Sequence, residues 1–270
     1  KALLMCGRDE IISRCASEIH QLSPPYPTRS ALRFGQGTDT DTEGNDSVPF
    51  SGLLRSSNLI RVENPSLTWF LENALKRDKA VVVSGGMSNW KALELWKDPN
   101  YFLKIAGQRS VPVEFGSNYT SSSWGQKIVR FGEFLCDHVV EKSNDNEKSL
   151  KRPRLSKGST AYLAQHELFL QIPELEQDIG VPDYCSLTLP GQHNTGKVAL
   201  NIWFGPKGTV SPFHHDPKHN LLAQIVGSKR ILLASPSESG YMYPNESILS
   251  NTSQVDVENI DDQAFPNFRK

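Results

Sequence analysis

Ser211-Pro-Phe-His-His-Asp216, followed thirteen residues later by Lys229, says more about this protein than any other part of its sequence. On an extended strand, residues two apart project from the same face, so His214 and Asp216 would lie side by side. An imidazole and a carboxylate are two of the three ligands in the two-histidine, one-carboxylate arrangement that holds non-haem iron(II). The pair alone is more typical of a surface loop of mixed charge, so its meaning depends on the residues that follow.

Two short apolar segments come next, residues 220–226 and 229–235, joined by Gly227-Ser228. A two-residue connection that begins with glycine is typical of a type I′ or II′ hairpin. Such a turn would pair Val226 with Lys229, and paired residues share a face of the sheet. The sequence therefore predicts a β-hairpin here, with the side chain of Lys229 on the same face as that of Val226.

Counting back from Val226 in steps of two extends this face to Asp216 and His214, although Pro217 could interrupt the strict alternation. Four polar side chains would then point the same way: Lys229, Asn220, Asp216 and His214. A lysine among apolar residues on an inward face needs an anionic partner, because burying a bare ammonium group is costly. The carboxylate of a small dicarboxylic acid would serve as that partner.

Residues 198–204 alternate cleanly and predict another strand. One face is apolar, and the other carries Asn201 and Trp203. On this second face the tryptophan would wall a pocket and the asparagine would bond a ligand. Packing of Trp203 against a second layer of structure explains the pattern about equally well.

With these features the chain resembles the JmjC (Jumonji-C) family of 2-oxoglutarate- and iron-dependent oxygenases. The resemblance runs from about Val48 to Lys270. It is carried by six stretches with the spacing typical of the family: Val111-Pro-Val-Glu-Phe-Gly-Ser117, Tyr162-Leu-Ala-Gln-His166, Ile172-Pro-Glu-Leu175, Pro182-Asp-Tyr-Cys-Ser-Leu187, Trp203-Phe-Gly-Pro206 and Asn251-Thr-Ser-Gln-Val-Asp-Val-Glu-Asn259.

The resemblance implies a role for each matching residue. His214 and Asp216 match the first two iron ligands, and no catalytic residue separate from the metal site is expected. The position near the metal-proximal end of 2-oxoglutarate is Asn220. The distal carboxylate of 2-oxoglutarate would be bound by Lys229, Tyr162 and Ser211. The substrate entrance would be lined by Glu114, Trp124 and Trp203.

The fold implied is mainly β with flanking helices: a double-stranded β-helix (jelly roll, cupin-like). The family's second histidine ligand lies several dozen residues after the aspartate, whereas His219 is the last histidine of this sequence and is expected in a loop. The expectation is therefore a JmjC domain incomplete at its C-terminus, either a fragment of an active protein or a truncated product without catalysis.

The activity implied is hydroxylation of protein side chains with Fe(II) as cofactor and 2-oxoglutarate as co-substrate. Two outcomes stay open, arginyl hydroxylation and histone methyl-lysine demethylation, so the partner would be a histone tail or another arginine-bearing protein. A role in chromatin or transcription would place the protein in the nucleus, with the cytoplasm also open. The alternative is a catalytically silent cupin-like protein-binding module. A zinc hydrolase of cupin shape is disfavoured because it gives Lys229 and Asn220 no task.

Composition sets the outer bounds. The 270 residues carry a net charge of −1 with a pI near 6.7, so nothing in the global charge favours nucleic acid as a direct partner. No run of 18 apolar residues occurs, and no membrane association is expected. Four cysteines, Cys6, Cys15, Cys136 and Cys185, lack zinc-ligand spacing and are expected to be free thiols in a reducing compartment.

Three regions are expected along the chain: a helical N-terminal segment (1–34), a polar acidic linker (35–47) and the JmjC domain (48–270). A disordered insert over 142–160 contains Lys151-Arg-Pro-Arg154, which suits a nuclear import signal or a solvated loop equally well. Within the domain, the pattern predicts helices over 67–79, with Ser66 as N-cap, 100–107 and 131–140. A strand is predicted over 80–84.

Overall fold

The computed structural model describes residues 32–34, 59–116, 119–120, 123–140, 160–189, 191, 198–246 and 249–269. The predicted N-terminal helix, the linker over 35–47 and the insert over 142–160, apart from its last residue, lie outside this part of the chain. Their predictions stay predictions. None of the helices in the described ranges has the length and apolar character that a bilayer-spanning helix requires.

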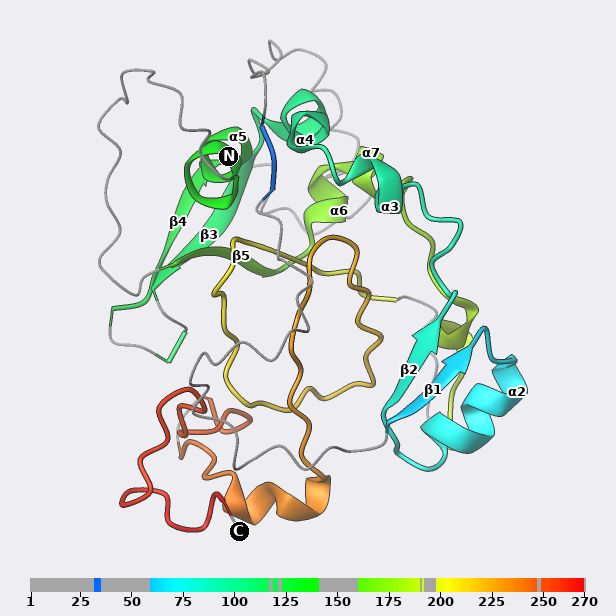
Figure 1. Ribbon diagram of the computed structural model, residues 1–270, viewed down its shortest axis with the longest axis vertical. Helices are drawn as coiled ribbons and strands as arrows, with labels where there is room; N and C mark the ends of the chain where they lie inside the picture. Colours follow the sequence, from blue (N-terminus) through cyan, green and yellow to red (C-terminus); the bar gives the residue numbers. More distant parts are fainter. Residues whose placement is uncertain are drawn as a thin grey trace, which may run out of the picture.

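The larger sheet in the described ranges is antiparallel. Its strands are β3 (Ser110–Gly116), β4 (Gly125–Arg130), β5 (Thr160–His166) and β6 (Ile202–Phe204), in the spatial order β4-β3-β5-β6. Strands β3 and β4 lie at the upper left of Figure 1. The register pairs Glu114 of β3 with Tyr162 of β5. Since cross-strand partners share a face, these two side chains lie next to each other.

Two helical segments pack an aromatic core against this sheet. They are α4 (Pro99–Ala106) and α5 (Phe131–Phe134), which continues as the π-helical turn η3 (Leu135–Val139). Four rings meet edge to face or tilted, with centroids 5.1–6.2 Å apart: Phe102, Phe131, Phe134 and Phe204. Each fully buried phenylalanine contributes about 1.5–3 kcal/mol to the free energy of unfolding. Because this core covers one face of the sheet, the other face is the one available for a functional site.

A smaller unit lies apart from this sheet, at the lower right of Figure 1. The strands β1 (Ile60–Glu63) and β2 (Val81–Ser84) pair in parallel. Between them run the helix α2 (Leu67–Phe70) and the π-helical turn η2 (Leu71–Leu75). The hydroxyl of Ser66 accepts a hydrogen bond from the Trp69 amide at 3.1 Å, which confirms the predicted N-cap. The predicted helices and strand of this region are thus present within a few residues of their expected bounds.

The remaining helical elements are short: α3 (Ala92–Leu95), α6 (Leu168–Gln171), α7 (Pro173–Glu176), and the 3₁₀ turns η4 (Asp183–Ser186) and η5 (Pro236–Tyr241). The buried carboxylate of Asp178 ties α3, α4 and α7 together. It accepts hydrogen bonds from the Trp96 indole at 2.9 Å and from the Tyr101 hydroxyl at 2.5 Å.

The prediction of a β-hairpin over 220–226 and 229–235 is wrong. The chain bends at Gly227, whose φ of +76° suits the predicted turn, but neither flanking segment is a strand. Leu222 and Leu233 are 55% and 62% exposed. A strand needs a neighbour for its backbone hydrogen bonds, and an apolar alternation alone does not supply one. The strand predicted over 198–204 is likewise shorter, because only Ile202–Phe204 pair with β5.

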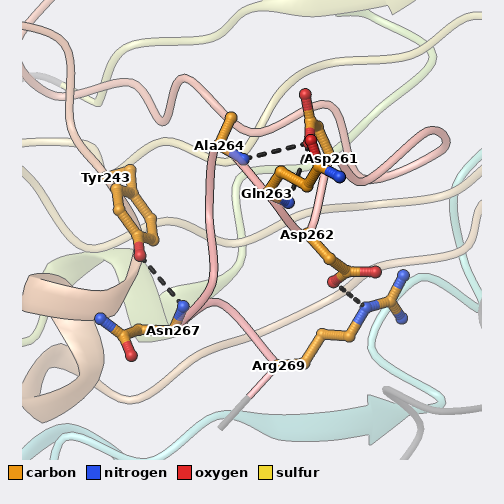
Figure 2. A network of polar contacts seen from close by, with 7 residues as sticks. All are labelled: Tyr243, Asp261, Asp262, Gln263, Ala264, Asn267 and Arg269. Carbon is orange, nitrogen blue, oxygen red and sulfur yellow. Dashed lines mark hydrogen bonds and ion pairs between the residues drawn. The ribbon is translucent and has the colours of Figure 1, made fainter.

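The C-terminal residues of the described chain are held by a polar network (Figure 2). Asp261 accepts hydrogen bonds from the backbone amides of Gln263 and Ala264, and Asp262 pairs with Arg269 at 2.6 Å. The hydroxyl of Tyr243 accepts a hydrogen bond from the Asn267 amide at 3.0 Å. This last bond ties the segment to the chain that follows η5.

Candidate functional site

Phe213, His214 and His215 form an extended segment that pairs with residues 251–253. His214 bridges antiparallel to Thr252. The His215 amide donates to the Asn251 carbonyl at 3.0 Å, and the Ser253 amide donates to the Phe213 carbonyl at 2.8 Å. The predicted extended geometry of the His-x-Asp stretch is therefore present, although its partner is a segment far along the chain.

The ring of His214 is prepared to act as a ligand. Its Nδ1 lies 2.8 Å from the Pro212 carbonyl oxygen. Because a carbonyl oxygen can only accept a hydrogen bond, Nδ1 carries the proton, and Nε2 keeps a free lone pair. Metal-binding histidines commonly have their tautomer fixed in this way by the other ring nitrogen.

Asp216 lies two residues further on and is exposed. The Asn220 side-chain amide donates a hydrogen bond to its Oδ2 at 2.5 Å. One carboxylate oxygen is thereby oriented, and Oδ1 is left for another partner. The structure thus brings Asn220 to Asp216, as the sequence predicts.

A second group of side chains gathers around the phenol of Tyr162. The ammonium of Lys229 donates a hydrogen bond to the Tyr162 hydroxyl at 3.2 Å, and the hydroxyls of Thr209 and Ser211 also bond it. Burial raises the pKa of Tyr162 to about 12, with a smaller contribution from the Glu114 charge opposed by the two hydroxyls. The same effect lowers the pKa of Lys229. One cation and three hydroxyls therefore converge on a partly buried point.

Gly205 makes this convergence possible. A Cβ atom built on Gly205 would lie 2.7 Å from Cδ2 of Tyr162 and 2.8 Å from Cγ2 of Thr209. Such distances are closer than real Cβ contacts, so any larger residue would displace the Tyr162 ring. The glycine of the Trp203-Phe-Gly-Pro206 stretch is accordingly required by packing against the cluster.

Glu114 stands beside Tyr162 on the neighbouring strand and receives a hydrogen bond from the Trp124 indole. Burial raises its pKa, and the Trp124 bond partly offsets that rise. The Tyr119 hydroxyl lies 3.3 Å from the Thr252 hydroxyl. Burial raises the pKa of Tyr119, the Thr252 bond opposes that rise, and the charges of Asp216 and Glu114 add to it. Tyr119 is thus linked through Thr252 to the segment that carries His214.

Two predicted residues, Asn201 and Trp203, are not part of this cluster in the described structure. Asn201 precedes β6, and Trp203 is an exposed residue in the middle of it. Three residues that sequence reasoning missed belong to the cluster: Thr209, Tyr119 and Thr252. Thr209 precedes Ser211 by two, a spacing that could have identified it on an extended segment.

The donor chemistry suits iron(II) and a dicarboxylate. A neutral imidazole nitrogen and a carboxylate oxygen are two ligands of the facial arrangement typical of non-haem iron, and the Lys229 group offers the donors that a carboxylate anion needs. In the described ranges no group of three His, Cys, Asp or Glu side chains could hold a metal ion. His214 and Asp216 would therefore supply two protein ligands of such a set, which requires a third.

Comparisons with known proteins agree with this geometry. The family model described as a cupin-like domain matches residues 66–270. The chain is 39% identical over 219 residues to Jumonji C domain-containing protein 5 of Drosophila melanogaster, covering 81% of this chain and 52% of that protein. It is 41% identical over 247 residues to Lysine-specific demethylase 8 of Xenopus tropicalis, covering 89% and 52%.

A plant relative is equally similar. Lysine-specific demethylase JMJ30 of Arabidopsis thaliana is 43% identical over 217 residues, covering 78% of this chain and 46% of that protein. The chain spans about half the length of these curated relatives. The resemblance expected from the sequence and the mainly-β, cupin-like fold are both confirmed. The chain belongs to the cupin-like domain family, as a member of its Jumonji-C group.

Proposed function

We propose that the protein is a 2-oxoglutarate- and iron(II)-dependent oxygenase that modifies protein side chains. The observation that carries the proposal is the bond between Lys229 Nζ and the Tyr162 hydroxyl, which is also bonded by Ser211, three residues before His214 in the chain. An anion site beside a metal-ligand pair is what a chelating dicarboxylic co-substrate needs. The printed names of the relatives, Jumonji-C proteins and lysine-specific demethylases, support the same activity.

Each residue of the site would have the role that its side-chain chemistry allows. His214 Nε2 and Asp216 Oδ1 would hold the iron, and Asn220 keeps the Asp216 carboxylate turned correctly. Lys229 and Tyr162 would bind the distal carboxylate of 2-oxoglutarate, with Ser211 completing the hydroxyl set. When bound, iron and 2-oxoglutarate together supply the chemistry that inserts one atom of molecular oxygen into a C–H bond, while 2-oxoglutarate becomes succinate and carbon dioxide.

Glu114 and Trp124 determine which substrates fit. A carboxylate beside an indole attracts a cationic side chain through charge and through cation–π contact. Both a methylated lysine and an arginine satisfy this requirement. Hydroxylation of an N-methyl group leads to loss of formaldehyde and demethylation, whereas hydroxylation of an arginine carbon gives a stable alcohol. The names of two relatives, lysine-specific demethylases, favour a methyl-lysine. A histone tail as the substrate and a nuclear role in chromatin are part of the same proposal.

The test is turnover in which the co-substrate and the peptide are followed together. The full-length protein is purified and incubated with Fe(II), ascorbate, 2-oxoglutarate and histone-tail peptides that carry either methyl-lysine or arginine. The full-length protein is needed because His214 and Asp216 would supply only two of the three protein ligands. The proposal expects succinate in a one-to-one ratio with modified peptide. Mass spectrometry then separates the gain of one oxygen atom from the loss of a methyl group. Binding of these peptides without succinate formation would instead support the silent protein-binding module.

Exchanging Glu114 for glutamine is expected to weaken peptide turnover and leave peptide-independent 2-oxoglutarate consumption unchanged. Glutamine keeps the shape and still accepts the Trp124 hydrogen bond, but it lacks the charge that attracts a cation. A hydrogen bond to a charged group contributes about 1.5–3 kcal/mol, so kcat/KM should fall about 10- to 150-fold. Glu133→Gln, an exposed glutamate on α5, is the matched control. Equal losses in both reactions would show that Glu114 is only structural.

Affinity for 2-oxoglutarate should weaken as the pH rises through the pKa of Lys229. Only the ammonium form attracts the carboxylate, and burial lowers this pKa, so the loss begins at a lower pH than for an exposed lysine. Isothermal titration from neutral to alkaline pH, in the presence of Ni²⁺, measures the effect. Lys229→Arg keeps its charge throughout this range and should bind with a flatter profile. Identical profiles for the two proteins would contradict the assignment.

A further inference from the structure

Asn251 binds the backbone of the segment that carries the two proposed metal ligands, His214 and Asp216, and is not part of that segment. Its backbone carbonyl accepts the hydrogen bond of the His215 amide at 3.0 Å, and its side-chain amide donates to the His215 carbonyl at 3.0 Å. Both polar groups of the His215 backbone are thus bound by one residue. His215 lies between the two proposed ligands, His214 and Asp216.

These two hydrogen bonds restrict the orientation of the peptide groups on either side of His215. The peptide group is planar, so holding the His215 carbonyl also fixes the plane that leads to the Cα atom of Asp216. Holding the His215 amide in the same way fixes the plane that follows His214. Asn251 therefore restricts the orientation of both ligand-bearing residues, although it contacts neither of their side chains in the described structure.

The segment that carries Asn251 is itself fixed. Thr252 is only 1% exposed, and its carbonyl accepts hydrogen bonds from both the backbone and the side-chain amide of Asn245, each at 2.9 Å. The Gln254 amide donates to the Tyr243 carbonyl at 2.8 Å, and Figure 2 shows Tyr243 in turn holding Asn267. A residue on such a support can impose an orientation on its partner.

The contact with His215 is exposed to solvent. Water can replace the Asn251 amide there, so its loss should cost little stability. Water does not fix the angle of a peptide plane, however. Orientation of the ligands and stability of the fold are therefore expected to respond differently to replacement of Asn251.

We propose that Asn251 is a positioning residue, which orients His214 and Asp216 for a divalent metal by clamping the His215 backbone from both sides. This inference rests on the proposed function, because it assumes that His214 and Asp216 bind the metal. Residues that orient metal ligands commonly contribute 10- to 100-fold to metal affinity. Asn251 acts in this way without itself being a ligand.

The test measures Mn²⁺ affinity from the electron paramagnetic resonance signal of the free ion, together with the Tm of each variant. Asn251→Ala should weaken Mn²⁺ binding about 10- to 100-fold, while the Tm falls by no more than about 4 °C. Asn251→Asp has the same size but cannot donate to the His215 carbonyl, so it should also weaken binding. Asn259→Ala removes an exposed amide that bonds Asp256 in the same region, and should change neither quantity.

Three outcomes decide the matter. Weak Mn²⁺ binding by both folded Asn251 variants supports the inference. Affinity within twofold of the parent in either variant, or a loss in both that only follows a loss of folded protein by circular dichroism, overturns it. Asp216→Ala separates this result from the proposed function. If that variant loses Mn²⁺ and the Asn251 variants do not, only the positioning role fails, whereas unchanged binding by Asp216→Ala removes the metal site itself.

Discussion

Asp216→Ala is expected to weaken Mn²⁺ binding by at least about 100-fold, the equivalent of roughly 2.7 kcal/mol. The carboxylate is the only anionic ligand of the pair, and its Oδ2 is already oriented by Asn220. Removal takes away both a ligand atom and the charge that offsets the loss of water from the metal ion. Equilibrium dialysis or titration with Mn²⁺, a redox-stable substitute for Fe²⁺, measures the effect.

Asp216→Asn makes the test sharper. The asparagine keeps the size of the side chain and an oxygen that can accept from Asn220, but it carries no charge. We expect nearly the same loss as for alanine, because a neutral amide is a weak ligand for a divalent cation. Asp183→Ala, at an exposed carboxylate that begins η4, should bind Mn²⁺ as the parent does. Full affinity in Asp216→Asn would show that the carboxylate is not a ligand.

Lys229→Met should weaken binding of 2-oxoglutarate about 10- to 150-fold while Mn²⁺ affinity stays within twofold. Methionine keeps the length of the side chain but removes the charge and the hydrogen bond, which together contribute about 1.5–3 kcal/mol. Metal affinity is unaffected because Lys229 bonds Tyr162 and belongs to the other half of the cluster. Calorimetric titration of 2-oxoglutarate at saturating Mn²⁺ gives the value.

The matched control is Lys207→Met, at an exposed lysine in the loop after β6. It removes the same charge from the protein without touching Tyr162. A similar loss of affinity in both variants would mean that net charge, and not a specific contact, attracts the dicarboxylate. Undiminished binding by Lys229→Met would remove Lys229 from the anion site.

The local parts of the fold are predictable from the sequence because their causes are local. Ser66 caps a helix since its hydroxyl satisfies an amide three residues away, and no distant residue is involved. The extended form of the His214 segment agrees with its spacing, but it is held by pairing with residues 251–253. The shape of a capped helix or an alternating strand depends on residues within one turn or one pleat.

The predictions that failed concern features that depend on residues far apart in the sequence. Residues 220–226 are mostly apolar, but whether they form a strand depends on a neighbouring backbone. The hydroxyls of Tyr119 and Thr252 lie 3.3 Å apart, although the two residues are separated by 133 positions in the sequence. No sequence pattern around either residue predicts this contact. The hairpin register that singled out Lys229 is absent, and the contact of Lys229 with Tyr162 depends on the tertiary structure. The role of Lys229 in binding an anion stays a prediction.

The most direct test of the central claim is calorimetric titration of the purified protein with 2-oxoglutarate, with and without Mn²⁺. The cluster joins a metal-ligand pair to an anion site, so the two ligands should bind as one unit. We predict one 2-oxoglutarate per protein when Mn²⁺ is present and at least about 10-fold weaker binding when it is absent. Binding that is equally strong without the metal, or no binding by the folded protein with it, would contradict the account.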